Sequence, residues 1–273
     1  RDAQESRGLG DVYKRQLFII VPMGLVAFFA FTDKSGAFTL DNIARVGQYS
    51  NVFLRSIWLG ALATFISLLL GYPLAYIIAK AAPNRQSFLI LLIMLPMWMN
   101  FLLRTYAWMS LLEDNGLINN MLAAVGLPRI HMINTAGAVV LGMVYNYIPY
   151  MILPIYSVLT KIDNSVIEAA QDLGANNRNV FLKVVLPMSM PGVISGVTMV
   201  FVPAVSTFII SKMLGGGGNL LIGDLIDMQF LGSAYNPNLG SAISLVLMVI
   251  ILICMGIMNQ FDDGENVGGG MIL

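Results

Sequence analysis

The chain alternates between long apolar runs and short polar connections. A helix that crosses a membrane needs about 20 apolar residues, and five of the runs reach or approach that length, whereas a run near the start is shorter. We therefore predict an all-α membrane protein with six transmembrane helices, at about residues 17–31, 56–79, 87–112, 137–160, 189–212 and 240–260.

Composition agrees with a membrane protein. The chain is 57% hydrophobic and 11% charged, with a mean hydropathy of +0.77, whereas apolar residues make up about 45–50% of a soluble domain. Fifteen Lys and Arg residues balance fifteen Asp and Glu residues. Net charge therefore gives no indication of a nucleic-acid partner.

The two ends of the chain differ from the rest. Residues 1–16 lack an initiator Met and an apolar stripe, and the composition changes abruptly at Leu17. We expect a non-native or disordered leader there and leave it out of the fold prediction; the first span is then short because its start is missing. Residues 17–261 are predicted to form one transmembrane domain with a core at about 52–260, followed by a short tail at 262–273.

Small residues recur at every fourth position of the second predicted span, at Ala63, Ser67, Gly71, Ala75 and Ala79. Residues four apart share a helix face, so this span carries a strip of small side chains. In lipid, helices associate through close backbone approach rather than through apolar burial. The strip is therefore either a static packing face or a seam along which helices move.

Several kinds of chemistry are absent from the sequence. His131 is the only histidine, so there is no HExxH zinc motif. GGGGN, residues 215–219, lacks the Lys-Ser/Thr of a phosphate-binding loop, and we expect a flexible turn. Every Asp and Glu lies outside the predicted spans, whereas ion-coupled carriers usually keep an acidic residue in the membrane. We therefore predict no enzyme, and an ion-coupled carrier is kept only as the less favoured alternative function.

One charge lies well inside a predicted span, at Arg104. An arginine at the middle of a bilayer costs about 2.5–3.5 kcal/mol on insertion scales, so this side chain should face protein or water. A structural pairing and a place on a transport pathway are both open, and the sequence identifies no partner.

The connection between the fourth and fifth spans, residues 161–188, is polar and highly patterned. Ser165 and Glu168 have the Ser-x-x-Glu spacing of a capping box, and Gly174 suits the left-handed residue that ends a helix. The apolar spacing predicts a first short helix with one face formed by Val166, Ala169, Ala170 and Leu173.

A second short helix is predicted after the glycine. Asn176 or Asn177 suits its cap, and Pro187 begins or bends the next span. Neither helix is long enough to cross a bilayer, so the apolar faces need lipid headgroups, the chain's own helix ends or another protein. The second apolar face comprises Val180, Phe181, Val184 and Val185.

This connection resembles the EAA loop of ABC importer permeases: Glu-Ala-Ala, three residues, Gly, nine residues, an aliphatic residue, one residue and Leu-Pro. Here it reads Glu168-Ala169-Ala170, Gly174, Val184 and Leu186-Pro187. The aliphatic residue is Val where the family most often has Ile. The stretches LLLGYPLAY, LPMWMNFLLRTYAW, DNGLINNML and LLIGDLIDMQF resemble the spermidine/putrescine branch, and the resemblance covers about residues 17–261.

The resemblance implies a type I ABC importer permease in the bacterial plasma (inner) membrane, with the EAA loop and both termini in the cytoplasm. Lys and Arg counts leave this sidedness undecided, because the loops on the two sides hold five each. Implied partners, besides membrane lipid, are an ATPase dimer, a second permease subunit and an extracytoplasmic substrate-binding protein. ATP and Mg²⁺ would be bound by the ATPase, and no cofactor by this chain.

Roles carry over residue by residue from the resemblance. Glu168 would meet a polar or basic group of the ATPase. Ala169 and Ala170 would allow its close approach, and Gly174 would form the elbow. Leu186 and Pro187 complete the motif. Closure of the ATPase dimer would push on the loop and tilt the spans between inward-open and outward-open states.

The resemblance also implies spermidine or putrescine as substrate. Aromatic faces and carboxylates attract such cations, although interfacial placement and packing equally explain Tyr and Trp, and an arginine facing the pathway would repel a polycation. An importer for another small solute, such as an amino acid, opine or oxyanion, is the alternative function. The candidate pathway residues are Asn100, Arg104, Trp108, Tyr145, Tyr147, Asp224 and Asp227.

Overall fold

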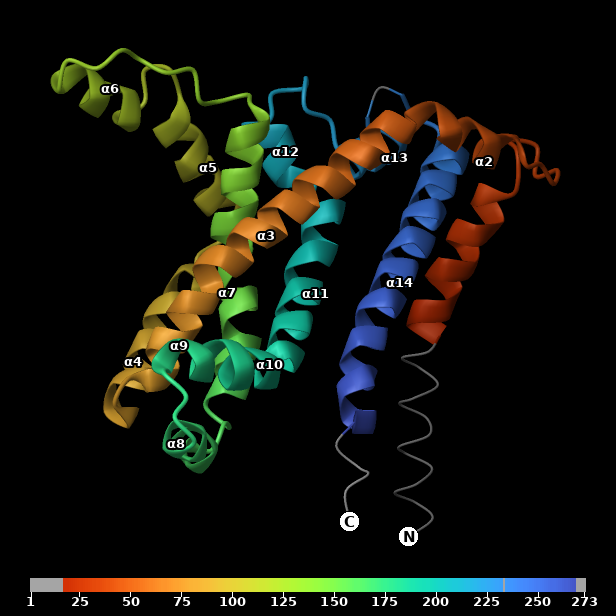
Figure 1. Cartoon of the computed structure of the whole chain (residues 1–273). Coiled ribbons are helices and arrows are strands. Elements are labelled where there is room, and N and C mark those ends of the chain that lie inside the picture. The colour runs from red at the N-terminus through yellow and green to blue at the C-terminus, as the bar shows by residue number, and fades with distance from the viewer. Residues whose placement is uncertain (1–16, 233, 269–273) are drawn as a thin grey trace, which may run out of the picture.

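The structure is a computed structural model that describes residues 17–232 and 234–268. The described part is built from helices joined by turns, with one isolated bridge between Thr32 and Phe38 (Figure 1). This confirms the all-α prediction. The predicted leader, residues 1–16, lies outside the described residues.

The first described helix, Leu17–Ala30, precedes the numbered elements. Two of these are 3₁₀ turns, η1 and η2, and η3 is a π turn. In chain order the elements are α2 Asp41–Val46, η1 Gly47–Tyr49, α3 Ser50–Lys80, α4 Pro83–Met94, η2 Leu95–Trp98, α5 Phe101–Leu112, α6 Leu117–Ala124, α7 Ala136–Leu159, α8 Asn164–Asp172, α9 Asn177–Val180, η3 Phe181–Val185, α10 Leu186–Met188, α11 Met190–Ser206, α12 Ile209–Leu214, α13 Ile222–Phe230 and α14 Pro237–Gly268.

In the described part of the chain, each of the six predicted spans corresponds to an apolar helical segment, and two of these segments are bent. Three helices are long and apolar enough to cross a membrane alone: Asp41–Lys80, Ala136–Leu159 and Pro237–Met258. Two bent pairs also qualify: Pro83–Trp98 with Phe101–Ala124, at 87°, and Asn177–Met188 with Met190–Ser206, at 60°. Leu17–Ala30 is the short sixth segment.

The predicted continuous span at 87–112 is broken near its middle. The helix that begins with α4 ends in η2, which contains Pro96, and Met99 is extended with φ −76° and ψ 147°; proline has no amide hydrogen for the helical bond four residues back. Asn100 then starts α5, because its side chain accepts hydrogen bonds from the N–H groups of Leu102 and Leu103, at 2.8 and 3.4 Å. A new cap directly after a helix end allows the 87° change of direction.

The fifth span also ends earlier than predicted. Helix α11 stops at Ser206, since Thr207 is extended with φ −64° and ψ 145°. Helix α12 then begins in a new segment, so residues 209–212 do not belong to the span.

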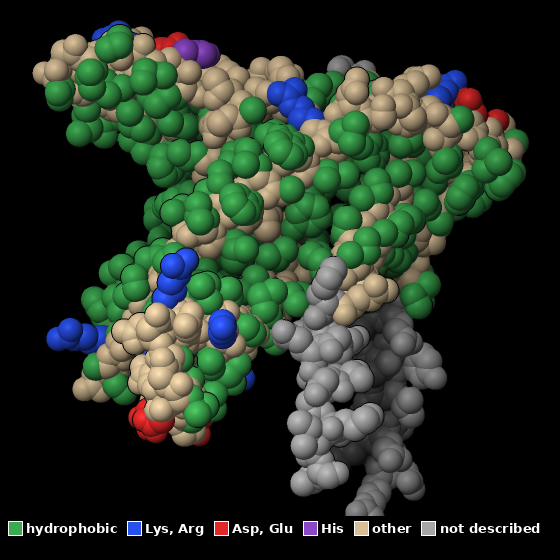
Figure 2. All heavy atoms as spheres, in the orientation of Figure 1, with side chains coloured by type: hydrophobic (Ala, Val, Ile, Leu, Met, Phe, Trp, Pro, Cys, Tyr) green, Lys and Arg blue, Asp and Glu red, His purple; other side chains and the backbone are tan. Residues whose placement is uncertain are grey.

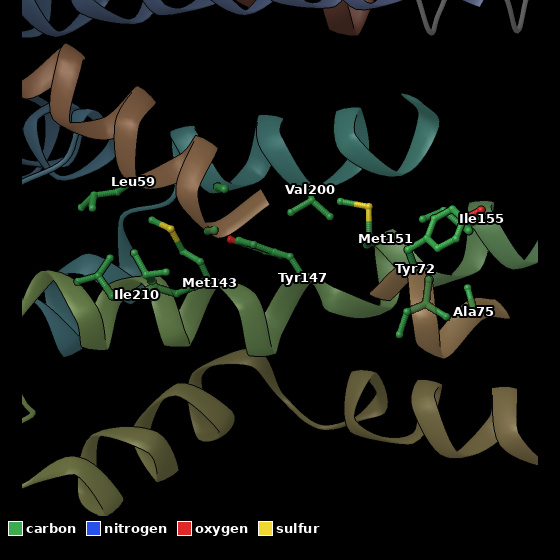
Figure 3. Close-up of a cluster of buried hydrophobic side chains, with 14 of the residues drawn as sticks. Leu59, Tyr72, Ala75, Met143, Tyr147, Met151, Ile155, Val200 and Ile210 are labelled. Carbon is green, nitrogen blue, oxygen red and sulfur yellow. The ribbon is translucent and has the colours of Figure 1, made fainter. Parts of the chain in front are cut away.

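Helices α3, α7 and α11 form the main core (Figure 3). Met143 and Met151 of α7 and Val200 of α11 are completely buried there. The strip of small residues on α3 faces the same core, so it is a packing face that lets α3 approach its neighbours closely. Its buried members are Ala63, Ser67, Gly71 and Ala75.

Two glycines of α11 meet the backbone of α7. A Cβ atom on Gly192 would lie 2.9 Å from the carbonyl oxygen of Pro154 and 3.0 Å from Cα of Ile155. A Cβ atom on Gly196 would lie 2.9 Å from the sulfur of Met151 and 3.1 Å from its carbonyl oxygen. Because a helix backbone has little freedom to move aside, only glycine fits without a shift of either helix.

A second cluster joins α13, α14 and the helix Leu17–Ala30, beside the main core (Figure 1). Its completely buried members from these three elements are Ala30, Ile222, Ala242 and Ile243. Helix α14 continues to Gly268, so the backbone of the predicted tail begins as an extension of the last span.

The bundle has two polar ends. The α8 end holds α8, α9, α10 and the turn between α3 and α4, and the α13 end holds α2, α6, α12 and α13 (Figure 1). Figure 2 shows charged side chains gathered at these ends and a broad hydrophobic band between them. Exposed apolar side chains in such a band match a lipid environment.

The glycine turn at the α13 end is held by hydrogen bonds rather than left flexible. Gly216 has φ +58°, a conformation that favours glycine. Arg55 of α3 donates to the carbonyl of Gly218 at 2.9 Å and to Oδ1 of Asn219. Asn219 donates to the carbonyl of Asn134 at 3.0 Å, so the turn is tied both to α3 and to the segment before α7.

The packing of α11 on α7 predicts the effect of adding one methyl group. Gly192→Ala should lower stability by about 1–3 kcal/mol, because the new Cβ overlaps backbone atoms that cannot rearrange cheaply. The matched control is Gly256→Ala on α14, where nothing lies within 4 Å of an added Cβ and alanine favours the helix. Thermal unfolding in detergent measures both, and equal stabilities would contradict the close approach.

Candidate functional site

Helix α8, which carries the Glu-Ala-Ala residues, is capped by Asp163 and not by the predicted capping box. The Asp163 carboxylate accepts a hydrogen bond from the N–H of Ser165 at 2.9 Å, and this bond lowers the pKa of that carboxyl below its usual value. Ser165 and Glu168 lie inside the helix. The prediction was wrong because Asp caps as well as Ser and occurs two residues earlier.

The predicted single apolar face of α8 is also wrong. Ile167 and Ala170 pack inward against the main core, whereas Val166 is 40% exposed and Leu173 is 89% exposed. Ile167, and not Val166, lies on the inward side, so the helix is rotated about its axis relative to the prediction.

We define the outer face of α8 by Glu168, Ala169 and Leu173, all of which are exposed. Within the described residues, Glu168 takes part in no side-chain hydrogen bond or ion pair. The outer face thus combines an uncompensated carboxylate, a small residue and a large apolar side chain.

The predicted glycine elbow is confirmed. Gly174 has φ +83°, in the left-handed region that favours glycine. The N–H of Ala175 bonds the carbonyl of Ala170 at 3.1 Å, closing the end of α8 as in a Schellman motif. Nothing lies within 4 Å of a Cβ built on Gly174, so backbone conformation and not space requires the glycine.

The second helical segment runs from α9 through η3 to α10. Asn176 caps it by accepting a hydrogen bond from the N–H of Asn179 at 2.8 Å, which decides between the two predicted caps. The predicted apolar face is confirmed, since Val180 and Val185 are buried and Phe181 packs against the core.

Two residues near the end of this segment complete the motif. Leu186 packs against the main core, and Pro187 is exposed. The next residue but one, Ser189, is fully buried and its Oγ lies 2.8 Å from the hydroxyl of Tyr72 on α3. The EAA residues therefore belong to one continuous segment that starts at an exposed helix and ends inside the core.

Two candidate pathway residues stabilise the break between α4 and α5. Asn100 caps α5, as described above. Arg104 is 8% exposed, and its Nη1 donates to the carbonyl of Pro96 at 2.8 Å. The guanidinium also lies over the ring of Phe101, 5.9 Å from the centroid. Arg104 therefore faces protein, as its insertion cost predicts, and its partner is a backbone carbonyl.

The three aromatic candidates occupy two places. Trp108 and Tyr145 form an edge-to-face pair with centroids 5.2 Å apart. Tyr145 also lines a groove of about 710 Å³ between α3 and α7. Tyr147 is 9% exposed and lies within the main core (Figure 3).

The two acidic candidates lie at the α13 end, beside a small cavity of about 90 Å³. Asp224 is 5% exposed and accepts a hydrogen bond from the N–H of Leu221 at 2.9 Å; burial raises the pKa of its carboxyl. Asp227 pairs with Lys212 at 3.0 Å. Within the described residues, no group of three or more His, Cys, Asp or Glu side chains is placed to hold a metal ion.

The seven pathway candidates therefore do not converge on one site within this chain. Of the seven, the groove between α3 and α7 contains Tyr145 alone, and the cavity at the α13 end contains the two aspartates alone. By contrast, the EAA residues follow one another along a single exposed-to-buried segment, which makes that segment the best-defined candidate site.

Sequence reasoning missed two groups at this site. Asp163 carried a signal, since it is a strong capping residue directly before the helix. The contact between Tyr72 and Ser189 carried none, because the two residues are 117 positions apart.

Comparison with known proteins agrees with this architecture. The family model for the binding-protein-dependent transport system inner membrane component matches residues 17–264. The spermidine/putrescine transport system permease protein PotB of Haemophilus influenzae is 38% identical over 244 residues, which is 86% of this chain and 85% of that protein.

Solved structures share the fold. A bacterial ABC transporter involved in the import of the acidic polysaccharide alginate matches with a TM-score of 0.77 at 18% identity, over 95% of this chain and 94% of that chain. A bacterial alginate ABC transporter in complex with an alginate pentasaccharide-bound periplasmic protein matches with a TM-score of 0.76 at 18% identity, over 94% and 93%. Taken with the match over residues 17–264, the chain belongs to the family of inner membrane components of binding-protein-dependent transport systems.

Proposed function

We propose that this chain is the permease subunit of an ABC importer for polyamines, and that the outer face of α8 docks on an ATPase subunit. The observation that carries the docking proposal is the exposed, unpartnered outer face of α8, at the start of a segment that enters the core. Two of its residues, Glu168 and Ala169, belong to the EAA motif, and Leu173 lies directly before the motif's Gly174.

The chemistry of the outer face suits a protein partner. Burying a leucine side chain contributes about 1.5–3 kcal/mol, so covering Leu173 would favour docking. Glu168 would pair with a basic or polar group of the ATPase, and Ala169 would let the two backbones approach. Because α8 is tied inward by Ile167 and Ala170, a force on its outer face would reach the bundle.

The proposed machine has further components. The alginate transporter bound to a periplasmic protein supports an extracytoplasmic binding protein as partner. A second permease subunit would complete the transport pathway, since the pathway candidates do not meet within one chain. ATP and Mg²⁺ would be held by the ATPase. The α8 end would then lie in the cytoplasm of the bacterial plasma membrane, together with both termini.

Polyamines are proposed as the substrate because the relative from Haemophilus influenzae bears that name and matches most of the chain. The position of Arg104 is compatible with a polycation, since its guanidinium is buried against the carbonyl of Pro96. The alternative function is an ABC importer permease for another small solute. The pathway roles of Trp108, Tyr145 and the two aspartates belong to this proposal.

The docking proposal predicts that Glu168→Lys and Gly174→Leu lose the ATPase. The chain would be co-expressed with the candidate ATPase subunits of its own genome and purified through a tag on the permease. We expect the native chain to retain an ATPase. Glu168→Lys should retain at least roughly ten times less ATPase, because the new lysine would face a basic group of the ATPase. Gly174→Leu should change the direction of α8, because leucine disfavours a positive φ.

The matched control for this experiment is Glu113→Lys. Glu113 is an exposed glutamate just after α5, toward the α13 end, so the charge change is the same and the location is opposite. Normal ATPase retention by Glu113→Lys and loss from Glu168→Lys would support docking through α8. If no ATPase co-purifies with the well-folded native chain, the docking proposal is refuted.

The substrate proposal predicts ATP-dependent uptake of spermidine or putrescine. The assembled transporter would be reconstituted in vesicles with the binding protein of the same genome and supplied with labelled polyamine. We expect uptake to require both ATP and the binding protein, with no competition from amino acids or oxyanions. Competition by such a solute, together with absence of polyamine uptake, would favour the alternative function.

A further inference from the structure

Ser189 lies at the joint between the α8 end and the membrane-spanning helix α11. The helical segments on its two sides meet at 60°. Pro187 and Pro191 flank the joint, and because Pro191 has no amide hydrogen, the carbonyl of Pro187 has no helical partner four residues on. The π turn η3 lies directly before the joint. The backbone on either side stays bonded, since the N–H of Ser189 donates to the carbonyl of Val185 at 3.0 Å and its carbonyl accepts from Val193 at 3.1 Å. The joint therefore lacks one helical bond, the one that Pro191 cannot donate.

Side chains add hydrogen bonds at the joint. The Ser189 hydroxyl donates to the carbonyl of Leu186 at 2.9 Å, so its single proton is used. Tyr72 must then be the donor across the 2.8 Å contact between its hydroxyl and the Ser189 oxygen. The result is a buried chain of hydrogen bonds from Tyr72 through Ser189 to Leu186, and such bonds strengthen one another.

This chain of bonds ties the joint to α3. Among the described residues, no other side-chain hydrogen bond links α3 to residues 161–206. Phe181, at the start of η3, packs edge-to-face between Tyr72 and Tyr76, with centroids 5.9 and 5.4 Å apart. The aromatic contacts hold the segment against α3, and the hydroxyl of Tyr72 adds a hydrogen bond at the joint itself.

We propose that Tyr72 and Ser189 are positioning residues that make the joint rigid, so that a push on α8 tilts α11 instead of changing the bend. This inference rests on the proposed docking of an ATPase on α8. On the far side of the joint, Gly192 and Gly196 fix α11 against α7. With the bond between Tyr72 and Ser189 intact, a displacement of α8 moves α3, α7 and α11 together. Without this bond, part of the displacement changes the angle at the joint instead of tilting α11.

The test compares ATP hydrolysed with solute transported. Tyr72→Phe and Ser189→Ala would be reconstituted as complete transporters in vesicles, with the binding protein and spermidine as probe. We expect each variant to keep its ATPase and to hydrolyse ATP. The number of ATP molecules used per spermidine should rise about five-fold, because the loss of one buried hydrogen bond changes an equilibrium by about that factor. The double variant should be no worse than Ser189→Ala alone, because Ser189→Ala already removes the bond to Tyr72 as well as the bond to Leu186.

Tyr76→Phe is the matched control. Tyr76 packs on the same Phe181 but forms no hydrogen bond with Ser189. The number of ATP molecules that Tyr76→Phe uses per spermidine should therefore equal the native value. An unchanged ratio in Tyr72→Phe, additive effects in the double variant, or loss of the ATPase from Tyr72→Phe would each overturn the inference. Failure of the docking proposal itself is distinguishable, since the native chain would then hold no ATPase and show no ATP-dependent uptake.

Discussion

Close approach of helix backbones is the constraint on which the rest of this structure depends. In lipid, apolar burial does not drive helices together, so contact area and hydrogen bonds must. Helix α3 meets the core through small residues such as Ala63 and Gly71, and α11 meets α7 through Gly192 and Gly196. These contacts leave no room for a side chain, so the three helices form one body whose parts cannot shift independently without cost.

The same constraint gives the α8 segment its significance. A short polar helix attached to a loosely packed bundle would deform its surroundings when pushed. Here the segment is capped by Asp163, turned at Gly174 and fastened at Ser189, so its outer face connects to the rigid body through defined contacts. The surface proposed to meet the ATPase and the helices proposed to move are parts of one mechanical path.

The other end of the molecule is tied differently. Arg55 and Asn219 bond the glycine turn to α3 and to the segment before α7. Asp227 pairs with Lys212, and Asp224 is buried, with one oxygen bonded to a backbone N–H and Oδ1 without a hydrogen-bond partner. Within the described residues, the pathway candidates therefore do not form one polycation site. This agrees with a pathway completed by a second permease subunit and with substrate choice by a separate binding protein, as proposed above.

The apolar pattern by itself determined the number and approximate place of the spans, because lipid demands runs of a given length. Local chemistry determined the elbow, since Gly174 alone suits a left-handed residue there. Tertiary structure decided the rest. The inward side of α8 and the bond between Tyr72 and Ser189 depend on neighbours far away in the chain. The break at Asn100 is local, formed by Pro96 and the Asn100 cap, but the apolar pattern does not report it. Sequence spacing reports which residues share a helix face, but it does not report which neighbour that face meets.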